Sequence, residues 1–147
     1  MKRVGVEKSV WWFKVNNVYV KTIRLKTYGP NALFDISGEI AKAVEESGIR
    51  KGVVVVFSHG STGSLVRLKD GFEEKFRKAL WDLIPIDGWE HPGNAYAHLR
   101  STLTSTKIVI PVVDGKPVIG ESRVYFVENQ CYVARDRRIT LAVHGEK

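Results

Sequence analysis

The stretch Val53–Ser64, which reads VVVVFSHGSTGS, decides how the fold is interpreted. Val53–Phe57 consists of five consecutive β-branched or aromatic residues, the pattern of a buried strand. The run ends abruptly in small polar residues, an exit that indicates a tight turn or a binding site. Because backbone N–H groups in a glycine-containing loop can form an anion site together with a cation, the loop Gly60–Ser64 is the first place to look for function.

The bulk properties of the chain fit one globular domain over residues 1–147. A hydrophobic fraction of 44% and a charged fraction of 27% are those of an ordinary globular protein, and the length suffices for a real core. No apolar stretch approaches the length of a membrane span, and no apolar run follows the basic residues at the amino terminus. We therefore expect a cytoplasmic protein with no membrane partner. The single cysteine, Cys131, rules out an internal disulfide framework.

The net charge of +7 favours anionic partners such as phosphate esters. The basic residues are dispersed, and no basic face interleaved with aromatic residues is visible, which argues against nucleic acid as the partner. The tightest basic groups are Lys21, Arg24 and Lys26, and Arg135, Arg137 and Arg138.

The first half of the chain predicts strands and two helices. Val18–Thr27 alternates and is rich in β-branched residues, so it predicts a strand, which is followed by a turn and a short strand, Ala32–Ile36, that pairs back on it. Ser37 can cap a helix that ends at Ser47-Gly48, with Ile36, Ile40 and Val44 on one apolar stripe. Leu65–Leu68 is the expected hairpin partner of the Val53–Phe57 strand. Asp70 and Glu73 resemble the capping box of a second helix, which Pro85 stops.

The second half predicts an irregular segment and then strands. Asp87–Asn94 contains Gly88, Pro92 and Gly93 and is expected to be irregular. Asp114-Gly115 between apolar runs is a strong signal for a hairpin turn. The overall order indicates an α+β fold with mainly antiparallel strands. The four strands predicted after the irregular segment are Lys107–Val113, Lys116–Gly120, Arg123–Glu128 and Arg137–His144.

The order of motifs, from about Tyr19 to Gly145-Glu146, resembles the YjbQ-like family of small proteins, for some of which a weak thiamine-phosphate synthase activity has been proposed. The resemblance implies a two-sheet, mainly antiparallel β-sandwich with two helices. It also implies a homotrimer with the site at or near subunit boundaries. The matching segments are Phe34–Ser37, Gly60–Leu65, Asn94–Arg100, Ile110–Lys116 and Arg123–Glu128.

The chain departs from the family pattern at several positions of the resemblance. Gly60 stands where many relatives have a histidine, and His59 lies one residue earlier. Of the common His-Ala-His motif only His98 is kept, with Tyr96 in place of the first histidine. Lys69 replaces an acidic residue of the relatives, so the site is shifted toward binding anions.

The residues and the resemblance together give a set of candidate site residues. The glycines free backbone N–H groups, the hydroxyls add neutral donors, and Arg100 can grip a phosphate in bidentate fashion. The alternative for the loop is a plain turn with solvated hydroxyls. The expected substrate-binding residues are Gly60, Ser61, Thr62, Gly63, Ser64, Asn94 and Arg100, and the expected catalytic residues are His98, Glu128 and His59.

No metal follows from the sequence, because zinc needs three or four ligands and only His98 and His59 are imidazoles near the loop. We expect Mg²⁺ to arrive with a phosphorylated substrate. The leading hypothesis is a small protein that binds a phosphorylated metabolite, with weak thiamine-phosphate synthase-like transferase activity implied by the resemblance. The alternatives are a non-catalytic module that binds an anion, a nucleotide or nucleic acid, and a structural oligomer.

Overall fold

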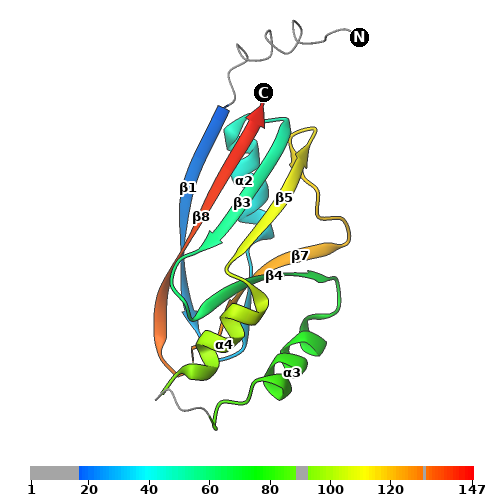
Figure 1. The fold of residues 1–147 in the computed structure, drawn as a ribbon. Coiled ribbons are helices and arrows are strands. Elements are labelled where there is room, and N and C mark those ends of the chain that lie inside the picture. The colour runs from blue at the N-terminus through cyan, green and yellow to red at the C-terminus, as the bar shows by residue number, and fades with distance from the viewer. Residues whose placement is uncertain (1–16, 89–92, 131) are drawn as a thin grey trace, which may run out of the picture.

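The computed structural model describes residues 17–88, 93–130 and 132–147, so Cys131 lies outside the described residues. Within them the chain forms three helices and two antiparallel sheets, an α+β arrangement of two packed sheets (Figure 1). The larger sheet has the strand order β1-β8-β3-β5-β6, and the smaller one β2-β7-β4. The strands of the larger sheet are β1 Asn17–Tyr28, β8 Ala134–Glu146, β3 Lys51–Ser58, β5 Lys107–Val113 and β6 Lys116–Pro117. Those of the smaller sheet are β2 Ala32–Asp35, β7 Ser122–Glu128 and β4 Gly63–Lys69.

The main core lies between one face of the larger sheet, the smaller sheet and helix α2, Ser37–Ser47. Alternate residues of the strands point into this core, as the two-residue period of a strand requires. The core residues of the larger sheet include Val54, Val56, Ile139 and Leu141, none of which is exposed. The stripe predicted on α2 is confirmed, since Ile36, Ile40 and Val44 are buried there.

The opposite face of the larger sheet carries apolar side chains that no described element covers. Val18 and Val20 on β1 are each 61% exposed, and Val109 on β5 is 60% exposed. Figure 1 shows α2 behind this sheet, so this uncovered face is the one turned toward the viewer. A contiguous exposed apolar surface of this kind is typical of an interaction site.

Two strand pairings differ from the sequence prediction. Ala32–Asp35 pairs with β7 rather than with β1, and Gly63–Lys69 also pairs with β7 rather than with β3. The reason lies in β7, where every residue except Arg123 is buried, so that this strand needs a partner on each edge. The strand β3 is instead flanked by β8 and β5.

The starts of both predicted helices also differ in detail. Ile36, not Ser37, is the N-cap of α2, and the Ser37 hydroxyl accepts a hydrogen bond from the Val124 amide at 2.8 Å. The capping box at Asp70 is wrong as well, because helix α3, Glu73–Leu83, starts after Phe72. In contrast, the turn at Asp114-Gly115 is confirmed, with φ of 51° and 76° and β5 paired to β6.

Helix α4, Ala95–Thr104, was not predicted, so the described residues hold three helices where the sequence indicated two. Its buried side includes Tyr96, Arg100 and Ser101, whereas Leu99 and Leu103 are exposed. This helix therefore lacks the apolar stripe by which a buried helix face is recognised in a sequence. The strand predicted over Lys116–Gly120 is likewise shorter, and covers only Lys116–Pro117.

Helix α3 covers the outer face of the smaller sheet through a second apolar cluster that contains Leu80, Val66 and Val127. Tyr125 on β7 donates a hydrogen bond to the Glu73 carboxylate at 2.7 Å. Burial of the ring, together with this bond, raises the pKa of Tyr125 to about 12. The same bond holds the pKa of Glu73 below its usual value. No helix among the described residues has the length and apolar character needed to cross a membrane.

Candidate functional site

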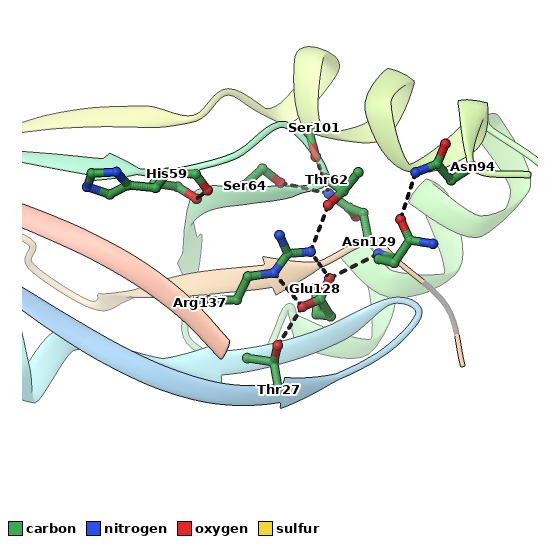
Figure 2. A network of polar contacts seen from close by, with 11 residues as sticks. Thr27, His59, Thr62, Ser64, Asn94, Ser101, Glu128, Asn129 and Arg137 are labelled. Carbon is green, nitrogen blue, oxygen red and sulfur yellow. Dashed lines mark hydrogen bonds and ion pairs between the residues drawn. The ribbon is translucent and has the colours of Figure 1, made fainter. Parts of the chain in front are cut away.

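A buried carboxylate, Glu128, is the centre of the polar network shown in Figure 2. Glu128 ends β7 and is 0% exposed. The Thr27 hydroxyl, from the end of β1, donates to Oε1 at 2.5 Å, and the Gln130 amide donates to Oε2 at 3.0 Å. Arg137 on β8 donates from Nε to Oε1 at 2.7 Å and from Nη2 to Oε2. The carboxylate is thus fully occupied by neighbours from three strand ends.

Arg137 is fixed by this network but keeps one end of its guanidinium unused. Besides its bonds to Glu128, Nη2 donates to Thr62 Oγ1 at 2.8 Å. A guanidinium has five N–H donors, and these contacts use the three on Nε and Nη2. Within the described residues Nη1 makes no hydrogen bond, and it retains contact with solvent. A Cβ added at Gly60 would lie 3.5 Å from Nη1, so the unused end is beside the loop.

The loop between β3 and β4 supplies backbone donors at the same place. Gly60 has a φ of +84°, which favours glycine, and both Gly60 and Ser61 are exposed. The amides of Gly60, Ser61 and Thr62 donate to no partner among the described residues. The two amides before them, those of Ser58 and His59, are used by neighbouring backbone carbonyls. We name Gly60, Ser61, Thr62 and the Arg137 Nη1 atom together the Gly60 corner.

The inner end of the loop is part of the packed structure instead. Asn129 donates from Nδ2 to the hydroxyl oxygens of Ser64 at 3.1 Å and Ser101 at 2.9 Å. The backbone N–H of Asn129 donates to the Thr62 carbonyl oxygen at 3.1 Å. A Cβ on Gly63 would overlap the ring of Phe126. Of the predicted loop residues, Gly63 and Ser64 are therefore enclosed, and only the first part of the loop is open.

The structure does not bring Arg100 to the loop. Its side chain is 0% exposed, and Nε and Nη2 donate to the Ile84 carbonyl at 3.0 and 2.6 Å. The guanidinium also lies 5.1 Å from the ring centre of Trp81 and 5.6 Å from that of Tyr96. Arg100 thus joins α4 to the end of α3, and Arg137 is the guanidinium beside the loop.

The other predicted residues surround the network without joining one centre. His98 is half-buried on α4, and none of the bonds of Glu128 goes to it. Asn94 donates to the Gln130 side chain at 3.0 Å, which places it beside the end of β7. The ring of His59 points away from Glu128 in Figure 2. Its Nε2 lies 2.7 Å from the Thr140 hydroxyl oxygen.

Sequence reasoning missed Arg137 and Thr27 as site residues, although a signal was present. In β8 the buried residues Ile139 and Leu141 alternate with Arg138 and Thr140, so the two-residue period places Arg137 on the inner face. An arginine on the inner face of a strand needs a buried anionic or polar partner, because an unpaired buried charge is costly. That requirement would have connected Arg137 to Glu128.

Among the described residues there is no group of three or more His, Cys, Asp or Glu side chains that could hold a metal ion. The acceptors of the network are already occupied by threonine, amide and arginine donors. What the Gly60 corner offers is N–H donors, which suit an oxyanion.

Comparison with known proteins gives a consistent family. A relative from Methanothermobacter thermautotrophicus, called a UPF0047 protein, is 30% identical over 88% of this chain and 94% of its own length. A solved YbjQ-like protein of unknown function from Sulfolobus solfataricus P2 is 28% identical, with a TM-score of 0.83 over 90% of this chain and 100% of that one. A hypothetical protein from Aeropyrum pernix K1 is 26% identical, with a TM-score of 0.78 over 86% of this chain and 98% of that one.

The sequence profile described as "UPF0047 protein YjbQ-like" matches residues 21–146, which include the whole Gly60 corner and the Glu128 network. This match covers more than half of the chain and agrees with the fold of the solved structures. The chain therefore belongs to the YjbQ-like UPF0047 family.

Proposed function

We propose that this protein binds the phosphate group of a small phosphorylated molecule at the Gly60 corner. One observation carries the proposal: Arg137 is fixed by Glu128 and Thr62, while its Nη1 atom stays unused beside Gly60, the first of three loop residues whose amides donate to no described partner. Such donors are already oriented before the ligand arrives, which lowers the entropic cost of binding. The Ser61 hydroxyl, which is exposed on the same loop, can add a neutral donor.

The geometry favours binding over acid–base catalysis by Glu128. This carboxylate accepts hydrogen bonds from Thr27, Gln130 and Arg137 and has no exposed surface. To take a proton from a substrate it would have to break its ion pair with Arg137 inside the protein, which is costly. We therefore assign Glu128 the role of holding Arg137. The transferase activity that the family resemblance implies stays a prediction, with Mg²⁺ arriving on the substrate.

The binding proposal is tested by calorimetric titration with pyrophosphate and inorganic phosphate at low ionic strength. In R137K the charge is kept but Nη1 is lost, so affinity should fall about tenfold, as expected for one charge-assisted hydrogen bond. The matched control is R138K, because Arg138 is the exposed neighbour on the same strand. Equal affinity of R137K and the parent protein, or no heat with either ligand or with dimethyl phosphate, would refute the proposal.

We also propose that the chain works in the cytoplasm as a homotrimer, as the family resemblance implies. What supports an assembly is the uncovered face of the larger sheet, where Val18, Val20 and Val109 are exposed. Light scattering of the eluting protein should give three times the monomer mass, and V20K should reduce it. A monomeric parent protein would refute this part of the proposal and leave the binding proposal intact.

A further inference from the structure

We propose that Glu128 sets the charge of the ligand: the Gly60 corner takes a singly charged oxyanion of the phosphodiester type in preference to a dianionic phosphate monoester. The inference rests on the proposed function, because it concerns the same corner. A phosphate esterified on both sides, as in a small diester, carries this single charge.

The charges within the network cancel. Arg137 brings one positive charge and Glu128 one negative charge, joined by two hydrogen bonds. The remaining partners of the pair, namely Thr27, Thr62 and the Gln130 amide, are neutral. The guanidinium at the corner thus belongs to a network whose net charge is zero.

The charge of an anion decides how strongly such a network binds it. Attraction to a fixed potential grows in proportion to the ligand's charge, whereas the cost of removing the ligand from water grows about as the square of that charge. At the same weak positive potential, the desolvation cost of a dianion can exceed its attraction while the attraction of a monoanion still exceeds its desolvation cost. A weak potential therefore favours the monoanion. Because Glu128 stands behind the guanidinium and is 0% exposed, solvent screens its opposing charge only weakly.

Removal of the Glu128 charge should reverse the preference. In E128Q the corner gains the full positive charge of Arg137, while Gln can still accept from the Thr27 hydroxyl. The gain in attraction for a dianion is twice that for a monoanion. The affinity for the dianion should therefore rise by about the square of the factor by which affinity for the monoanion rises.

The experiment compares dimethyl phosphate, a monoanion, with methyl phosphate, a dianion at pH 8, by calorimetry at fixed ionic strength. We expect the parent protein to bind dimethyl phosphate at least as tightly as methyl phosphate, and E128Q to bind methyl phosphate more tightly. The matched control is D136N, since Asp136 is exposed and pairs with Lys26 at the surface. That change should alter both affinities by less than about twofold.

A second measurement needs no variant and keeps the inference testable if E128Q does not fold. Methyl phosphate passes from monoanion to dianion near pH 6, so its affinity for the parent protein should fall as pH rises from 5 to 8. Dimethyl phosphate does not titrate in this range and reports any change in the protein itself. The ratio of the two affinities is the quantity to follow.

The outcomes separate this inference from the proposed function. The inference is overturned if the parent protein binds methyl phosphate tenfold more tightly than dimethyl phosphate at pH 8. It is also overturned if E128Q raises the affinities for both esters by the same factor. In either case the binding function stands. If neither ester binds, both fail. A decanucleotide that binds more tightly than dimethyl phosphate, with steep weakening by salt, would assign the diester to a nucleic-acid backbone rather than to a small molecule.

Discussion

Removal of the Arg137 guanidinium should be among the most destabilising single changes in this protein. In R137M the carboxylate of Glu128 stays buried and charged but loses both hydrogen bonds from the guanidinium. Only the Thr27 hydroxyl and the Gln130 amide still donate to it. Thr62 also loses a donor at 2.8 Å. The change therefore leaves a buried charge without its counter-charge.

The magnitude follows from this geometry. Breaking a buried ion pair on one side costs about 3–5 kcal/mol, and Glu128 is at the fully buried extreme at 0% exposed. For a domain of this size that loss corresponds to a melting temperature lower by roughly 10–20 °C. The double variant R137M/E128Q has no buried unpaired charge, so its free energy of unfolding should be about 2 kcal/mol higher than that of R137M.

The assay is urea unfolding followed by tryptophan fluorescence at pH 8, with R138M as the matched surface control. R138M should stay within about 0.5 kcal/mol of the parent protein. Glu128 and Arg137 are not a coupled pair if R137M is as stable as R138M. The same conclusion follows if the double variant R137M/E128Q is less stable than R137M.

Three further predictions test the loop and the outer layer of the smaller sheet. G60A should lower stability by about 1–2 kcal/mol, because a φ of +84° strains alanine, and should weaken phosphate binding in calorimetry; unchanged binding would exclude Gly60 from the corner. G63A should cost about 2–3 kcal/mol in urea unfolding because its methyl group overlaps the Phe126 ring, yet phosphate should still bind to the folded fraction. Tyr125 has a pKa raised from 10.0 to about 12, so it contributes stability that is complete below pH 10 and is lost as pH rises through about 12, roughly 3 kcal/mol at most. In Y125F unfolding experiments this loss between pH 10 and 12 should be missing, and an identical loss would refute the assignment.

Local pattern determined the strand and helix elements that depend only on nearby residues. Alternation fixed the position of β1, the period of four residues fixed the buried side of α2, and Asp114-Gly115 fixed the hairpin turn. The motif order led to the family as well, since Gly60–Leu65 and Asn94–Arg100 lie inside the matched range. These features need no knowledge of distant parts of the chain.

Tertiary structure alone decided which strands pair and which arginine serves the loop. β2 and β4 both pair with β7, more than fifty residues away in sequence, because β7 is buried on both faces. Arg100 lies closer in sequence to the loop than Arg137 does. Arg100 nevertheless donates to the Ile84 carbonyl, and it is Arg137 that lies beside Gly60. Strand pairing and burial of a charge depend on contacts between distant segments, and a residue pattern cannot specify which of several such contacts has the lowest free energy.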